Sequence, residues 1–151
     1  MSTMKVLICQ EIKNLVWEVR ERPVPGDNEA LIKIKTVGIC GTDIHAWAGN
    51  QPFFSYPRVL GHEICGEIIE SGKNIHNFNI GQQVAVIPYI SCQQCPACKS
   101  GRTNCCEKIS VIGVHQDGGF SEYLSVLQRK DFRLYYSAVQ AVPECRRVSF
   151  R

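Results

Sequence analysis

The chain has 151 residues, a formal net charge of +3 and 44% hydrophobic residues, which allows one hydrophobic core. Its longest uninterrupted apolar runs are only about four residues, which excludes a membrane-spanning helix. The apolar run after residues 1–5 is too brief for a secretory signal, so we expect a cytoplasmic protein with no membrane partner.

Short strands are the first elements expected along the chain. Residues 31–37 alternate apolar and polar side chains as a half-buried strand does. Similar short runs occupy residues 4–9, 15–19 and 83–87. Turn residues punctuate these runs at Pro25-Gly26, Gly49-Asn50 and Ser71-Gly72. Few stretches show a helical period, so the sequence predicts a mainly β fold of the barrel type.

Three potential metal ligands lie near the middle of the strand-rich region. Cys40 follows the apolar run 37–39, where a lone cysteine is usually a small buried hydrophobic residue. His62 and Glu63 interrupt apolar surroundings, and charged side chains there need a partner or a metal. A core histidine beside an exposed glutamate explains the pair equally well, so these residues alone leave both interpretations open.

Four closely spaced cysteines give the strongest metal signal, with two, two and seven residues between them: Cys92, Cys95, Cys98 and Cys106. Residues 93–104 offer little apolar surface beyond Ala97, so packing alone cannot order this segment. Four thiolates around Zn²⁺ can order it, because the binding free energy becomes folding free energy. We predict a structural zinc lobe over residues 91–107, with Cys105 as an alternative fourth ligand.

Two other uses of these cysteines fit less well. An iron-sulfur run of the bacterial ferredoxin type starts with the same spacing, but its fourth cysteine follows after three residues and precedes a proline. Here seven residues separate Cys98 from Cys106, and the proline, Pro96, follows the second cysteine of the set. A disulfide framework is disfavoured because the chain has nine cysteines, an odd number, and no signal peptide.

Four blocks of sequence together resemble the medium-chain zinc-containing alcohol and polyol dehydrogenases. The blocks are Gly-Ile-Cys-Gly-Thr-Asp-Ile-His at 38–45, Gly-His-Glu-x2-Gly-x5-Gly-x2-Ile at 61–75, the four cysteines, and Gly-Gly-Phe-x-Glu-Tyr at 118–123. Their order and spacing agree with the family across residues 1–126. Within the family, the sequence most resembles the sugar-acid (galactonate-type) and polyol branch. The resemblance implies a catalytic domain over 1–126, folded as a GroES-like, partly open barrel.

The resemblance also implies which residues surround two zinc ions. Cys40, His62 and Glu63 match positions around a catalytic zinc, where Glu63 is either a ligand or the neighbour of one. The four cysteines match the structural lobe of the family. Asp43 matches the carboxylate that orients the zinc-binding histidine.

A proton relay is the remaining implication for catalysis. Zinc with an open coordination position is a Lewis acid that lowers the pKa of a bound hydroxyl. The resemblance implies that a hydride then passes from a secondary alcohol of a polyol or sugar acid to NAD or NADP. Thr42 and His45 match the hydroxyl and imidazole that carry the substrate proton to solvent. Without the resemblance, Thr42 would be interpreted as a strand-end hydroxyl and His45 as an exposed loop histidine.

No part of the sequence carries the signature of a nicotinamide-binding domain. The Gly-x-Gly-x-x-Gly turn of a Rossmann domain does not occur among the 151 residues, and a full enzyme of this family needs roughly twice this length. We therefore expect NAD or NADP to bind only in a full-length version, which would be homo-oligomeric, and we expect this chain to be inactive alone.

The composition changes near the end of the family resemblance. Residues 1–126 contain 11 Lys+Arg and 12 Asp+Glu, whereas residues 127–151 contain 6 and 2. Our hypothesis is that 127–151 is a non-family tail produced by a reading-frame shift or an equivalent interruption, so that the chain is a truncated product. A genuine basic arm that binds nucleic acid is the weaker alternative, and a zinc-stabilised binding module without enzymatic activity is another.

Overall fold

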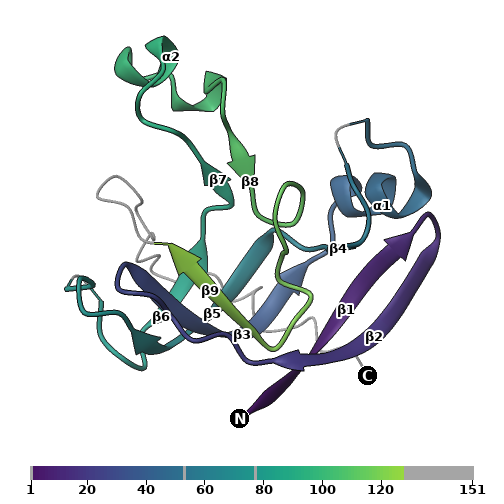
Figure 1. Cartoon of the computed structure of the whole chain (residues 1–151), viewed down its shortest axis with the longest axis horizontal. Helices are drawn as coiled ribbons and strands as arrows, with labels where there is room; N and C mark the ends of the chain where they lie inside the picture. The colour runs from purple at the N-terminus through teal and green to yellow at the C-terminus, as the bar shows by residue number, and fades with distance from the viewer. Residues whose placement is uncertain (1, 53, 77, 128–151) are drawn as a thin grey trace.

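The computed structural model describes residues 2–52, 54–76 and 78–127, and it is mainly β (Figure 1). Apart from Leu127, the predicted tail 127–151 lies outside the described residues. The strands are β1 (Thr3–Glu11), β2 (Asn14–Glu21), β3 (Glu29–Gly38), β4 (Arg58–Val59), β5 (Glu63–Ser71), β6 (Gln83–Val86), β7 (Tyr89–Ile90), β8 (Ser110–Val111) and β9 (Tyr123–Leu127). The helices are α1 (Gly41–Ala48), α2 (Pro96–Lys99) and the 3-10 turn η1 (Thr103–Cys105).

The first sheet has the strand order β2-β1-β4 and begins with the β1–β2 hairpin. Both strands of this hairpin were predicted, and they pair antiparallel from Thr3 opposite Glu21 to Cys9 opposite Leu15. The inner face of the sheet buries Val6, Ile8 and Val59. Its outer face leaves apolar side chains in solvent, including Trp17 at 70% exposure.

The second sheet has the order β6-β5-β3-β9 and carries the main core. The strand predicted at 31–37 is confirmed as part of β3, and the strand predicted at 83–87 is confirmed as β6 except for its last residue. β3 differs from the half-buried pattern in its first half, where the consecutive residues Ala30, Leu31 and Ile32 are all fully buried. Only the second half of β3 alternates, so this strand is covered on both faces near its start and on one face near its end.

The two sheets meet without closing into a cylinder. An isolated bridge joins Val6 to Ser121, and the half-buried Phe120 packs against three core clusters. The described strands form separate sheets of three, four and two strands, which confirms the predicted partly open barrel. Every pairing between the named strands is antiparallel, so residues 2–127, apart from 53 and 77, contain no parallel sheet of the Rossmann type.

The cysteine segment extends away from the barrel as an arm (Figure 1). β7 and β8 pair at its base, and α2 lies near its far end. Its cluster of buried residues consists of three cysteines, with only Cys92, Ala97 and Ile109 packed against them. In the part of the chain that the structure describes, no helix has the length and hydropathy needed to cross a membrane.

Candidate metal centres

The register between β3 and β5 assembles the first candidate centre. Gly38 at the end of β3 pairs with Glu63 at the start of β5. Cys40 comes two residues after β3 and His62 one residue before β5, so the pairing brings them together although 22 residues separate them. The Cys40 Sγ lies 3.2 Å from the His62 Nε2. One ligand atom each from Cys40, His62 and Glu63 lies within 4.8 Å of the others.

Helix α1 fixes the position of the Cys40 sulfur. Cys40 is the N-cap of α1, and its Sγ accepts a hydrogen bond from the Thr42 backbone N–H at 3.2 Å. In return, the Cys40 N–H donates to Asp43 Oδ2 at 3.0 Å, which completes a capping box. The helix ends at Gly49, whose φ of 81° gives the left-handed conformation of a common helix stop. A cysteine is an unusual N-cap, and this one holds the sulfur at the helix start.

Asp43 connects the two halves of this centre. It is only 3% exposed, and its Oδ1 accepts the Gly61 N–H at 2.9 Å. The same oxygen lies 3.7 Å from His62 Nδ1, which is buried and has no hydrogen-bond partner among the described residues. That distance is too long for a hydrogen bond, but it places the carboxylate on the Nδ1 side of the ring. The Nε2 side is therefore the one that faces the Cys40 sulfur, as a metal ligand requires.

Glu63 is exposed, and a glycine makes room for its side chain. A Cβ atom added to Gly38 would overlap the Glu63 carboxylate oxygen Oε2. This role of Gly38 was not predicted from the sequence, where the only signal for it is a glycine at the end of a predicted strand, two residues before the candidate ligand Cys40. A sulfur, an imidazole and a carboxylate are a donor set that suits Zn²⁺ and leaves a fourth position open. The residues present thus fit a zinc ion.

The predicted relay residues Thr42 and His45 both lie on α1. They are three residues apart and so share one face of the helix. Thr42 is half-buried and His45 is exposed. No hydrogen bond among the described residues joins the Thr42 hydroxyl to the His45 ring. The group of potential ligand atoms that lie together contains Cys40, His62 and Glu63 but not His45. The role of Thr42 and His45 in a relay stays a prediction.

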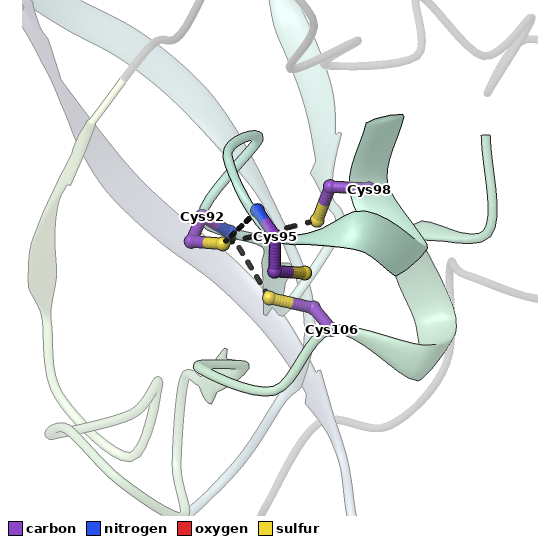
Figure 2. Close-up of side chains that lie close together, drawn as sticks. All are labelled: Cys92, Cys95, Cys98 and Cys106. Carbon is purple, nitrogen blue, oxygen red and sulfur yellow. Dashed lines mark hydrogen bonds between the residues drawn. The ribbon is translucent and has the colours of Figure 1, made fainter. Parts of the chain in front are cut away.

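The second candidate centre lies in the arm (Figure 2). One sulfur from each of Cys92, Cys95, Cys98 and Cys106 lies within 4.8 Å of the others. Backbone N–H groups also point at these sulfurs: the Cys92 N–H donates to Cys106 Sγ at 3.2 Å, and the Cys95 N–H donates to Cys92 Sγ at 3.4 Å. Cys105, the alternative fourth ligand, is exposed within η1. The structure therefore places Cys106, and not Cys105, with the other three sulfurs.

Three thiols of the arm have pKa values that are shifted in different directions. The pKa of Cys92 is lowered to about 6, mainly because the backbone N–H groups of Gln94 and Cys95 donate to its sulfur. The pKa of Cys95 is also lowered, chiefly by the Cys98 backbone N–H. Burial, followed by the contact with Cys95, raises the pKa of Cys98 to about 12. Without a cation these sulfurs cannot all ionise near neutrality, whereas a bound Zn²⁺ would compensate their charge.

Comparison with known proteins places the chain in a family. The family model for the alcohol dehydrogenase GroES-like domain matches residues 26–135. The chain belongs to this family. The predicted fold and family are therefore confirmed, while the predicted domain boundary at residue 126 stays a prediction.

Individual members of the alcohol dehydrogenase family match closely. The L-galactonate-5-dehydrogenase of Escherichia coli strain K12 is 84% identical over 126 residues, which cover 83% of this chain and 37% of that protein. A zinc-type alcohol dehydrogenase-like protein of Haemophilus influenzae is 50% identical over 120 residues, covering 78% of this chain and 35% of that protein. The resemblance to the galactonate-type branch is thus confirmed.

A solved structure shows the same fold. A zinc-binding dehydrogenase of Sinorhizobium meliloti 1021, bound to NADP, superposes with a TM-score of 0.79 at 38% sequence identity. The match covers 84% of this chain and 37% of that chain. The chain therefore spans little more than a third of the length of the relatives that it matches.

Proposed function

We propose that this chain is the zinc-binding catalytic domain of an NAD(P)-linked dehydrogenase that oxidises a secondary alcohol of a polyol or sugar acid. The supporting observation is the 3.2 Å approach of Cys40 Sγ to His62 Nε2, with the Glu63 carboxylate close to both. The 84% identity to a dehydrogenase named for L-galactonate supports a sugar acid as the substrate class.

The side chains around Cys40 have separate tasks in this proposal. Cys40, His62 and Glu63 would hold a zinc ion, which when bound supplies Lewis acidity toward the substrate hydroxyl. Asp43 would keep the His62 ring oriented, because its carboxylate lies on the Nδ1 side and is itself held by two backbone N–H groups. The four cysteines of the arm would hold a second zinc with a structural role.

Thr42 and His45 would move the substrate proton. Thr42 lies two residues after Cys40 and is half-buried. Its hydroxyl can both accept and donate a hydrogen bond. His45 is exposed, so its imidazole is open to water and could pass a proton to it. The helix places both on one face of α1, and a substrate or water molecule would have to bridge the gap between them.

The hydride acceptor would bind in a region beyond this chain. No Gly-x-Gly-x-x-Gly turn occurs among the 151 residues, and the chain spans only 37% of the NADP-bound relative. We propose that residues 1–126 are the catalytic domain, that this chain alone neither binds the nicotinamide nor turns over substrate, and that a full-length version is a cytoplasmic homo-oligomer.

Metal analysis of the purified 151-residue chain tests the proposal. We expect about two zinc ions per chain, one for each cluster of ligands. Cys40→Ala should remove one ion and leave the arm loaded, and Cys95→Ala should remove the other. Cys105→Ala, which changes an exposed cysteine outside both clusters, is the matched control and should keep both ions. One zinc per chain, unaffected by Cys40→Ala, would refute the proposed catalytic domain.

A further inference from the structure

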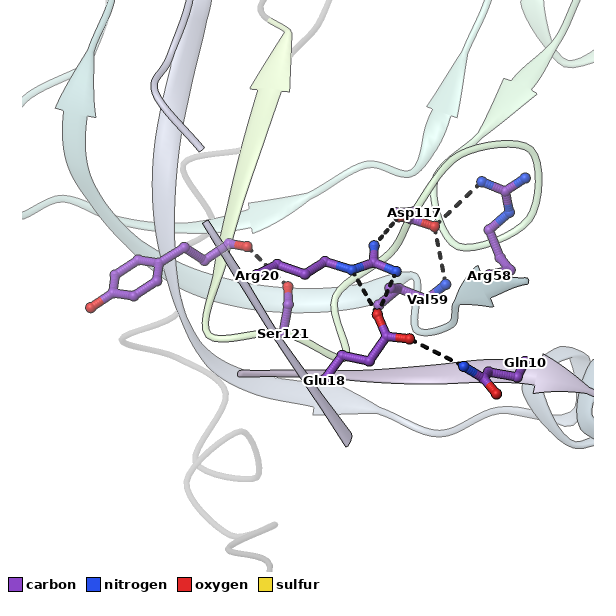
Figure 3. Close-up of polar contacts among 8 residues, drawn as sticks. Gln10, Glu18, Arg20, Arg58, Val59, Asp117 and Ser121 are labelled. Carbon is purple, nitrogen blue, oxygen red and sulfur yellow. Dashed lines mark hydrogen bonds and ion pairs between the residues drawn. The ribbon is translucent and has the colours of Figure 1, made fainter. Parts of the chain in front are cut away.

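An aspartate outside the metal ligands receives three hydrogen bonds, two of them from the segment just before His62 (Figure 3). Asp117 Oδ1 accepts the Val59 backbone N–H at 3.1 Å and the Arg58 Nη1 at 3.3 Å. Its Oδ2 accepts the Arg20 Nη1 at 3.0 Å. Asp117 directly precedes the Gly-Gly-Phe block and is not among the site residues predicted from the sequence.

The contacts of Asp117 continue into the β1–β2 hairpin. Arg20 also donates through Nε and Nη2 to Glu18 Oε2, at 3.1 and 3.0 Å. Glu18 Oε1 accepts the Gln10 Nε2 at 3.2 Å. The network therefore links β1, β2, β4 and the loop that leads to β9, although Asp117 lies 97 residues from Arg20 and 59 from Arg58. The Asp117 side chain is 44% exposed, so solvent screens its ion pairs and their main effect is on geometry.

The segment held by Asp117 leads directly to a proposed ligand. Backbone N–H groups of Gly118, Phe120 and Gly119 donate to the carbonyl oxygens of residues 59, 60 and 61, at 2.8, 3.0 and 2.8 Å. Residue 61 precedes His62, and its own N–H donates to Asp43. Two carboxylates thus hold this segment: Asp43 from α1 holds Gly61, and Asp117 from the loop holds Val59.

We propose that Asp117 is a positioning residue for the metal centre. By fixing Val59 and Arg58 against the 117–120 loop, it sets the path of the backbone at residue 62 and so the place of the His62 Nε2 relative to the Cys40 sulfur. This inference rests on the proposed function, because it requires a metal at Cys40, His62 and Glu63.

Cobalt(II) titration of the full 151-residue chain tests the proposal by a readout other than activity. The arm offers four thiolates and the barrel centre one, so their sulfur-to-cobalt charge-transfer bands differ in intensity and can be followed separately. Asp117→Asn keeps the side-chain size and removes the charge. We expect it to weaken cobalt binding at the single-thiolate centre by about tenfold, the lower end for residues that orient ligands, and to leave the four-thiolate band unchanged.

The control is Asp27→Asn. Asp27 forms an ion pair with Lys73 at 2.8 Å, and its side chain is 58% exposed, so this variant loses a comparable charge away from both centres. It should bind cobalt at both centres as the unmodified chain does.

Each outcome bears on a distinct claim. An unmodified chain without a single-thiolate band would overturn the proposed function and this inference together. A single-thiolate band that keeps its affinity in Asp117→Asn would overturn the inference alone, and so would an equal loss of affinity at both centres. If Asp117→Asn fails to fold, Arg20→Met leaves the Asp117 carboxylate in place and removes its Oδ2 contact together with the two bonds from Arg20 to Glu18. This variant must then show the same selective loss.

Discussion

The two candidate metal centres are built in opposite ways. In the arm, all four sulfurs come from residues 92–106, and little else is buried there beyond Ala97 and Ile109. In the barrel, Cys40 and His62 come from the ends of two paired strands that rest on a large core. We therefore propose that the arm needs a metal to have a fixed structure, whereas the barrel is held by its own core and would present ligands to a metal.

Metal removal should give the largest difference between the two regions. Structural zinc contributes on the order of 10 kcal/mol to small zinc-folded units, so chelation should unfold the arm and leave the barrel folded. Trypsin would then cut after the exposed Lys99 and Arg102 at least about tenfold faster than in the zinc-loaded chain. Cleavage after the exposed Lys73, which lies outside the arm, is the internal reference for the rate of cleavage. Equal rates at Lys99 with and without chelator would contradict the comparison.

A smaller effect is expected when the internal support of the barrel centre is removed. Asp43→Ala deletes a buried acceptor of two backbone N–H groups, from Cys40 and Gly61. Hydrogen bonds to a charged group contribute about 1.5–3 kcal/mol each, so we expect the loss of two such bonds to lower the free energy of unfolding by about 3–6 kcal/mol, measured by urea denaturation of the zinc-loaded chain.

The arm should not respond to this change, and its zinc should stay bound in Asp43→Ala. Asp27→Ala is the matched surface control and should change the free energy of unfolding by less than about 0.5 kcal/mol. The interpretation of Asp43 as a connecting residue is wrong if the two alanine variants lose the same stability.

The smallest effect concerns a cysteine that belongs to neither centre. Cys9 is fully buried, and burial raises the pKa of its thiol above the ordinary value of 9.0. The folded state thus holds this proton more tightly than the unfolded state, so its contribution to stability is complete below about pH 9 and is lost as the pH rises toward the folded pKa.

Cys9→Ala should therefore flatten the alkaline loss of stability. We expect the zinc-loaded chain to lose up to about 1 kcal/mol more than Cys9→Ala between about pH 9 and 10, measured as a difference in urea midpoints. Cys105→Ala, which removes an exposed thiol, should follow the unmodified chain. Parallel curves for Cys9→Ala and the unmodified chain would show that burial of this thiol does not matter.

The same contrast explains what could be predicted from the sequence. The cysteine set of the arm is local, so spacing and poor apolar content were enough to find it. The strands within β1, β2, β3 and β6 were found because their apolar residues recur at short intervals. The grouping of Cys40 with His62 depends on the register of β3 and β5, which no local pattern reveals, and only the family resemblance indicated it.

Other elements escaped prediction for identifiable reasons. Helix α1 has eight residues and buries only Asp43 and Ala46, so it carries almost no helical period. β5 was missed because its buried row includes Gly66, a position where a side chain would collide with the backbone of β3 at Lys33. Asp117 gave no signal, because its partners Arg20 and Arg58 are distant in the sequence.

The loops beside His62 meet with no side chain between them. Gly61 has a φ of 88°, and a Cβ atom on either Gly113 or Gly118 would collide with its carbonyl oxygen. A side chain at Gly61, Gly113 or Gly118 would therefore strain or displace the backbone next to His62. Replacing any of these three glycines by alanine should destabilise the fold more than replacing the exposed Ile44 on α1 by alanine.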